Sequence, residues 1–212
     1  LSGVLGFADL LAISPNIVEE EEEFLQEIID AGDSLRMMID SVITYSNILS
    51  GNVRIIADWH DMDALIEKSS EAARRLCIRR GLDFQIEMVR APEKICVDEM
   101  RLQEVLEQLL DNAVKFTESG QICLGVSTHE DKVILEISDT GPGISAEAEM
   151  RLYEPYSKTL VKDGQLRRGV GLGLTLVKAL CDLMNGRVDY VTSAGRGTTF
   201  RVELPLIYTP AL

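Results

Sequence analysis

Basic side chains are scarce in this chain. Its 212 residues include 21 Lys and Arg against 35 Asp and Glu, a formal net charge of -14. This acidity argues against a nucleic-acid-binding protein and against a peripheral binder of anionic membranes, because both need clustered Lys and Arg. No run approaches the roughly 20 apolar residues that span a bilayer, and no signal peptide is present. With 46% hydrophobic residues, the chain is still rich enough in apolar side chains for a packed core.

Paired cysteines are lacking too. The four cysteines are widely spaced and form no CxxC pair: Cys77, Cys96, Cys123 and Cys181. Their apolar neighbours predict buried, reduced thiols, with a disulfide or a metal site as the alternatives that spacing leaves open. Reduced thiols fit the cytosol, so we expect a cytoplasmic location. The chain opens at Leu1 rather than Met, which predicts a fragment of a parent protein that can be membrane-anchored elsewhere.

The first fifty residues have the pattern of a helical hairpin. An apolar helix is expected at 1–12, followed by the Ser14-Pro15-Asn16 break and a second helix to about residue 50. The second helix carries a heptad seam: Leu25, Ile28, Gly32, Leu35, Ile39, Val42, Ser46 and Leu49. A helix roughly 50 Å long needs partners along its length. A second copy of the hairpin would complete a four-helix homodimer, and a monomeric helical cap is the alternative.

Beyond Gly51 the pattern alternates, so we divide the chain into a hairpin at 1–51 and a second domain at 52–212. We expect strands at 53–56, 82–89, 121–128, 132–138, 187–192 and 198–204, and helices at 61–80, 98–116 and 173–184. The first helix has residues at helical spacing, Leu65, Ser69, Ala72 and Leu76, and the second is expected to turn inward Leu102, Val105, Leu106, Leu109 and Ala113. This order predicts an α+β sandwich, a mixed sheet with helices on one face.

Three glycine clusters interrupt this second domain. The first, 139–144 (DTGPGI), follows a predicted strand; the second, 169–174 (GVGLGL), precedes a predicted helix; the third, 195–198 (GRGT), joins the last two strands. Glycines that open a helix direct free N–H groups and the positive end of the dipole toward an anion. The spacing matches neither a Rossmann fingerprint nor a P-loop, and the HRD and DFG signatures of protein kinases are absent. For the third cluster alone, a tight turn is the preferred interpretation.

The helix predicted at 98–116 carries a polar stripe opposite its leucines. Glu104, Gln108, Asn112 and Lys115 are spaced 4, 4 and 3 apart and therefore share one face. Taken alone, such a face is usually just solvated. Beside two glycine-rich anion loops, however, Asn112 offers an oxygen for Mg²⁺ and Lys115 a contact for a phosphate.

These motifs, in this order, resemble the catalytic core of a sensor histidine kinase. Residues 109–117 (LLDNAVKFT) are similar to the family's N box, 139–144 to its G1 box and 169–174 to its G2 box. Residues 195–198 match its last glycine motif, and 152–156 (LYEPY) its F box, with Tyr where Phe is usual. The opening hairpin is similar to the dimerisation and histidine-phosphotransfer region, so the resemblance covers nearly the whole chain.

The resemblance implies a Bergerat-type ATP site. Asp139 would accept a hydrogen bond from the adenine amino group, Asn112 would bind Mg²⁺ with Gln108 beside it, and Lys115 would approach the phosphates. Residues 157–168 would form a lid, whose Lys158, Lys162, Arg167 and Arg168 offset the acidic field of the chain. The other residues expected at the nucleotide are Gly141, Gly143, Ile144, Tyr156, Gly169, Gly171, Leu172, Gly173, Leu174 and Thr198.

The sequence departs from the family pattern in two places. The phosphoacceptor histidine is missing, and residues 1–7 resemble the segment that follows it; His60 and His129 are expected to be ordinary surface histidines. Gln108 stands where the N box often has its first Asn. We therefore expect a kinase core that binds MgATP, transfers the γ-phosphoryl group to a histidine absent from this fragment and then to an aspartate of a response regulator.

Two alternatives remain beside this expectation. A catalytically degenerate pseudokinase would act as a dimerising signalling module, which Gln108 and the missing histidine motivate. An ATPase of the gyrase or chaperone type is disfavoured, because those proteins typically place a catalytic Glu four residues before the metal-binding Asn, and position 108 is Gln.

Overall fold

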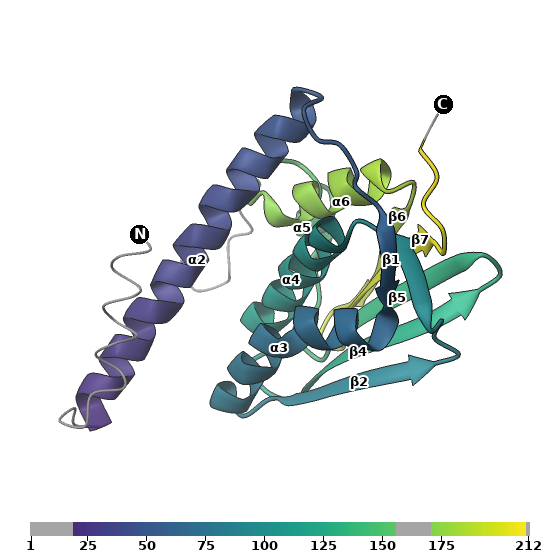
Figure 1. Cartoon of the computed structure of the whole chain (residues 1–212). Coiled ribbons are helices and arrows are strands. Elements are labelled where there is room, and N and C mark those ends of the chain that lie inside the picture. The colour runs from purple at the N-terminus through teal and green to yellow at the C-terminus, as the bar shows by residue number, and fades with distance from the viewer. Residues whose placement is uncertain (1–18, 156–170, 211–212) are drawn as a thin grey trace.

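The computed structural model describes residues 19–155 and 171–210, which form one long helix and an α/β sandwich (Figure 1). The long helix, α2 (Glu19–Leu49), confirms the second helix of the expected hairpin. It passes beside α6 and packs Tyr45 and Ile48 against the core of the sandwich. The first helix expected at 1–12 lies outside the described residues.

The sandwich is built on a five-stranded mixed sheet in the order β2-β4-β5-β7-β6. The strands are β2 (Asp83–Val89), β4 (Gln121–His129), β5 (Lys132–Asp139), β6 (Arg187–Ser193) and β7 (Gly197–Pro205). β2 and β4 run parallel, whereas the other neighbours are antiparallel. Three helices, α3 (Met62–Arg80), α4 (Glu99–Phe116) and α6 (Gly173–Leu183), cover one face (Figure 1). The predicted α+β architecture is confirmed.

Helices α3 and α4 each begin at an aspartate that caps them. Asp61 accepts from the Ala64 N–H at the start of α3, and Asp98 accepts from the Arg101 N–H at the start of α4. The five residues expected to face inward from α4 are all buried. In α3 the expected helix is confirmed, but Ala72 is exposed, because the buried row follows i, i+4 spacing: Leu65, Ser69, Ala73 and Cys77.

The prediction of a strand at 53–56 was wrong. Those residues form an irregular connection in which the Ile56 N–H donates to Asp98 Oδ2 at 2.8 Å instead of entering a ladder. A two-stranded antiparallel sheet, β1 (Asp58–Asp61) with β3 (Lys94–Val97), follows instead, and a short helix, α5 (Ala146–Glu149), comes after β5. The sequence did not predict these three elements, since each has only four residues and no clear period.

All four cysteines are free thiols, as expected. Cys77 and Cys181 are buried, and burial raises the pKa of the Cys181 thiol to about 12; Cys96 and Cys123 are half-buried. Within residues 19–155 and 171–210, no group of three His, Cys, Asp or Glu side chains is placed to hold a metal ion. None of the helices described there is both long and apolar enough to cross a membrane.

Candidate functional site

The first and third glycine clusters and the end of α4 meet at one end of the sandwich. β5 ends at Asp139, and the backbone of Gly197, where β7 begins, lies against the Asp139 carbonyl so closely that a Cβ there would clash. A Cβ on Gly141 would lie 2.9 Å from the Phe116 carbonyl oxygen at the end of α4. Glycine is therefore required at both positions for this close approach of backbones.

Asp139 is held at the centre of this junction. Its Oδ1 accepts hydrogen bonds from the Gly141 N–H at 2.8 Å and the Thr198 N–H at 3.3 Å. Burial raises the pKa of the Asp139 carboxyl, and the two backbone hydrogen bonds oppose that shift. Oδ2 accepts no hydrogen bond from any residue that the structure describes. The carboxylate is thus fixed in orientation and keeps one oxygen for an N–H donor.

The first glycine cluster is tied to the last two strands. Gly143 has a positive φ of +75°, and the Ile144 N–H donates to Thr192 Oγ1 at 2.8 Å. The hydroxyls of Thr192 and Thr198 are 3.0 Å apart. The third cluster is the expected tight turn, and it also contacts the first cluster, since the Gly195 N–H donates to the Pro142 carbonyl at 2.8 Å.

The polar stripe of α4 lies on one face, but that face is not simply solvated. Asn112 is half-buried, and Lys115 pairs with Asp111 one turn earlier. Gln108 is only 8% exposed, and its Nε2 donates to Ser41 Oγ of α2 at 3.1 Å. A Cβ on Gly173 would lie 2.6 Å from Gln108 Oε1 and 3.9 Å from Asn112 Nδ2. The stripe therefore faces the start of α6.

The N-terminus of α6 has no side-chain cap. Leu172 stands at the N-cap position, is 2% exposed and makes no capping hydrogen bond. The first amides of α6 are thus left without the side-chain oxygen that usually satisfies one of them, and the dipole adds partial positive charge. Gly171 and Leu174, both half-buried, flank this helix start.

Tyr153, in the segment that resembles the F box, was not among the predicted site residues. Its carbonyl accepts from Thr175 Oγ1 of α6 at 3.0 Å, and its ring contacts Tyr190. The Tyr153 hydroxyl is buried with no hydrogen-bond partner in the described part of the chain, and burial raises its pKa to about 12. The Tyr at a position where the F box usually has Phe was the one feature of the sequence that could have pointed to this residue.

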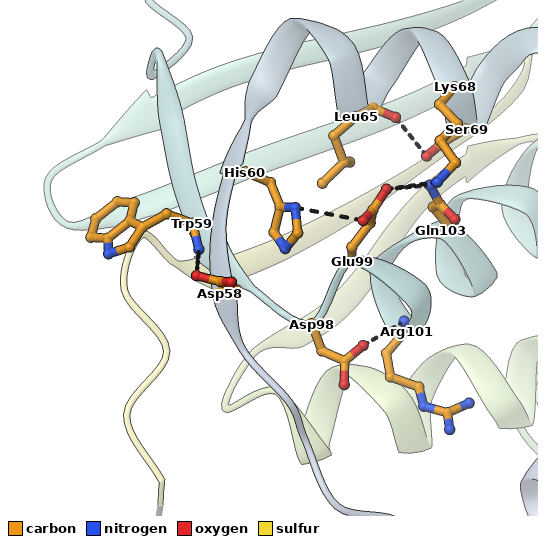
Figure 2. A network of polar contacts seen from close by, with 10 residues as sticks. All are labelled: Asp58, Trp59, His60, Leu65, Lys68, Ser69, Asp98, Glu99, Arg101 and Gln103. Atoms are coloured by element: carbon orange, nitrogen blue, oxygen red, sulfur yellow. Dashed lines mark hydrogen bonds and ion pairs between the residues drawn. The ribbon is translucent and has the colours of Figure 1, made fainter.

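A polar network fixes the opposite end of α4 (Figure 2). Asp98, which caps α4, also holds the connection from α2 through Ile56. Glu99 accepts from Lys68 Nζ at 2.8 Å and lies 3.6 Å from His60 Nδ1. The hydrogen bond from Lys68 is the main cause that lowers the pKa of the Glu99 carboxyl. His60 thus belongs to the start of α4, whereas Asn112 and Lys115 lie in its last turns.

One cavity among the described residues lies away from this site. A cavity of about 140 Å³ lies at the far end of the sheet, between the β4–β5 turn, the start of β6 and the end of β7. Its Glu203 is 7% exposed and pairs with Lys132, Arg187 and Arg201. We assign this cavity no role, because its charges neutralise one another.

Six residues predicted to contact or cover the nucleotide lie outside the described residues: Tyr156, Lys158, Lys162, Arg167, Arg168 and Gly169.

The donor set suits a magnesium nucleotide. Asn112 supplies a hard oxygen of the kind that Mg²⁺ accepts. The uncapped α6 amides and Lys115 suit phosphates, and the Asp139 carboxylate suits an exocyclic amine. The clash that a Cβ would cause at Gly173 indicates that α6 begins tightly against the stripe of α4.

Known proteins are similar to this chain in sequence and in fold. The family model described as histidine kinase-, DNA gyrase B- and HSP90-like ATPase matches residues 97–207, just over half of the chain. The chain is 30% identical to the autoinducer 2 sensor kinase/phosphatase LuxQ of Vibrio parahaemolyticus and 32% identical to the circadian input-output histidine kinase CikA of Synechococcus elongatus. Each match covers 97% of this chain but only 25% and 28% of those proteins.

Two solved structures agree with these relatives. Full-length ShkA in complex with AMPPNP matches with 28% identity and a TM-score of 0.73, over 99% of this chain and 43% of that one. The mycobacterial sensor histidine kinase MprB matches with 27% identity and a TM-score of 0.59, over 73% and 100%. The chain therefore belongs to the histidine kinase-, DNA gyrase B- and HSP90-like ATPase family, and its sandwich is the ATP-binding catalytic domain of a histidine kinase.

Proposed function

We propose that this chain is the kinase core of a two-component sensor. It binds MgATP and donates the γ-phosphoryl group to a histidine, from which the group passes to an aspartate of a response-regulator receiver domain. The observation that carries the proposal is Asp139: a carboxylate held by two backbone N–H groups, with one oxygen left for a donor, at the point where three sequence motifs meet.

Asp139 recognises the base. Because Oδ1 is engaged by the chain itself, Oδ2 accepts the hydrogen bond from the adenine amino group. Gly141, Gly143, Ile144 and Thr198 form the walls, where glycine lets a flat ring approach the backbone. A carboxylate accepts and does not donate, so a keto oxygen at the same place on guanine is disfavoured.

The phosphates lie between α4 and α6. The amides at the start of α6, which no side chain caps, and Lys115 bind the anionic groups, and Asn112 ligates the metal, with Gln108 as a second candidate ligand. Mg²⁺, when bound, neutralises phosphate charge and polarises the γ-phosphoryl group. The rest of the proposed phosphate contacts come from Gly169, Gly171, Leu172, Gly173, Leu174, Tyr156, Lys158 and Arg167.

Phosphoryl transfer mainly requires that the reacting groups be positioned and the phosphate charge neutralised. These groups therefore suffice without a nucleophile in the sandwich. The acceptor is a histidine other than His60 and His129. His60 pairs with Glu99 at the start of α4, and His129 pairs with Lys132 at the opposite end of β5 from Asp139. Both are therefore remote from the proposed γ-phosphate position.

The exposed seam of α2 supports a homodimer. Ile28, Leu35 and Ile39 are 48%, 48% and 46% exposed, in the heptad spacing of a helix that packs against another helix. Two copies of the hairpin then form a four-helix bundle, which also docks the receiver domain. We extend the same proposal to a cytoplasmic location for this part of the parent protein.

Titration calorimetry with MgATP tests nucleotide binding. Asp139→Asn keeps an oxygen for the Gly141 and Thr198 N–H groups but presents an NH₂ group to the adenine amine, so we expect affinity to fall at least about 100-fold. Asp131→Asn, in the exposed β4–β5 turn, is the matched control and should bind like wild type. Absence of MgATP binding by wild type would defeat the proposal.

The pseudokinase is kept as a second candidate because Ser41 engages Gln108, the residue that departs from the N box pattern. Incubation of the full-length parent protein with γ-labelled ATP separates the two. Acid-labile label on a histidine supports the kinase. MgATP binding without any label on the protein supports the pseudokinase.

A further inference from the structure

The face of α2 that turns toward the sandwich is small. Ser41 is 5% exposed, and Tyr45 and Ile48 pack against the core one and two turns later. The opposite face carries the exposed apolar seam. Ser41 is therefore the polar residue at the centre of the contact between α2 and the catalytic domain.

The Ser41 hydroxyl makes two hydrogen bonds. It donates to the Met37 carbonyl of its own helix at 2.7 Å and accepts from Gln108 Nε2 at 3.1 Å. Both side chains are more than nine-tenths buried.

The other end of the Gln108 amide lies over the start of α6. A Cβ on Gly173 would be 2.6 Å from Gln108 Oε1, so this oxygen lies directly against the first residue of the helix. The N-terminus of α6 is otherwise uncapped by any side chain. This oxygen therefore lies beside the residue that opens α6, near the region of partial positive charge where we place the phosphates.

We propose that the Ser41–Gln108 hydrogen bond is a latch through which docking of α2 opposes nucleotide binding. While the bond holds, Gln108 Oε1 stays over the α6 N-terminus and competes with the phosphates. When α2 leaves, Gln108 is released. By linkage, bound nucleotide disfavours the docked α2 to the same extent. Gln108 is then a positioning residue whose state depends on α2, and this inference rests on the proposed function.

The test compares two serine variants of the same helix. Ser41→Ala removes the latch. Ser50→Ala is the matched control, because Ser50 Oγ also donates to the carbonyl four residues earlier, at 2.8 Å, but is exposed. Calorimetry would measure the Kd of MgATP and of adenosine, which has no phosphate. Hydrogen exchange of residues 37–49 would measure docking of α2.

We expect Ser41→Ala to tighten MgATP binding roughly fivefold and to leave adenosine within about twofold of wild type, since a neutral hydrogen bond contributes about 1 kcal/mol. Exchange in 37–49 should speed up in Ser41→Ala and not in Ser50→Ala.

A MgATP Kd in Ser41→Ala that is unchanged or weaker would overturn the latch, as would equal tightening of adenosine. Those results leave the proposed function intact. Absence of MgATP binding by wild type overturns the proposed function itself, so the two failures are distinguishable.

Discussion

α2 and α4 are both long helices with an apolar face, yet they are covered very differently. In α4 the leucines Leu102, Leu106 and Leu109 are 0% exposed beneath the sheet and its neighbouring helices. In α2, by contrast, Leu35 and Leu49 are 48% and 71% exposed. The difference teaches that the sandwich buries its apolar residues against its own sheet and helices, whereas the sandwich leaves the apolar seam of α2 uncovered.

The largest expected effect is on stability, when the same Leu→Ala substitution is made in each of the two helices. Leu109→Ala in α4 leaves a cavity in the core, and we expect the free energy of unfolding of the sandwich to fall by roughly 2–5 kcal/mol. Leu35→Ala in α2 should change it by no more than about 0.5 kcal/mol, because that side chain is not buried in the sandwich. Denaturant unfolding measures both. Similar losses in the two variants would break the comparison.

Self-association should respond in the reverse order. If the seam of α2 is the homodimer contact, Leu35→Ala should weaken dimerisation at least roughly tenfold, since it removes apolar area buried only in the assembly. Analytical ultracentrifugation over a concentration series would show this. Asp40→Asn, exposed on the same helix, is the control and should associate like wild type. A wild-type chain that stays monomeric would instead favour the helical-cap alternative.

A smaller effect is expected at Tyr153. Its buried hydroxyl has no partner in the described part of the chain, so Tyr153→Phe should raise stability by about 1 kcal/mol. Tyr190→Phe is a natural counterpart, because the Tyr190 hydroxyl donates to Glu149 Oε2 at 3.3 Å. That variant should gain nothing. Thermal melting of both compares an unpaired with a paired hydroxyl on adjacent rings.

The smallest effect is a pH dependence. The Asp139 carboxyl has a pKa raised above its ordinary 3.8 by burial. As pH rises from that value through the folded pKa, the native state holds a proton that the unfolded state has lost, so stability falls across this window. Asp139→Asn removes the group and should flatten that part of the profile. A wild-type profile that rises more steeply than the variant's would contradict the sign.

Local signals explain why most of the sandwich was predictable. The ends of α4 follow from a capping aspartate and a leucine period that lie within 19 residues, and neither depends on a distant contact. The hairpin of β4 and β5 follows from two alternating runs and a two-residue turn, where Glu130 adopts a positive φ of 56°. That Asp139 and the third glycine cluster lie at one site was implied by the resemblance to histidine kinases.

Other features had no local signal. β1 reads Asp-Trp-His-Asp, which has no apolar alternation, and it exists because β3 pairs with it from more than thirty residues away. Ser41 and Gln108 are 67 positions apart, and both look like solvated polar residues on a helix. Both are buried because α2 packs on the sandwich beside α6. Helical periodicity does not predict how these two helices pack. The sequence placed the polar stripe opposite the leucines of α4, but it gave no sign that Gln108 would be buried beneath α2.

Hydrogen exchange with and without MgATP tests most directly that the separate motifs form one nucleotide site. Protection should appear together at the end of α4, after β5, at the start of α6 and at the start of β7, around Asn112, Asp139, Gly173 and Thr198. The far end of the sheet, around Lys132 and Arg187, should not change. Protection confined to that far end, or absent from the four segments while nucleotide is bound, would contradict a single site.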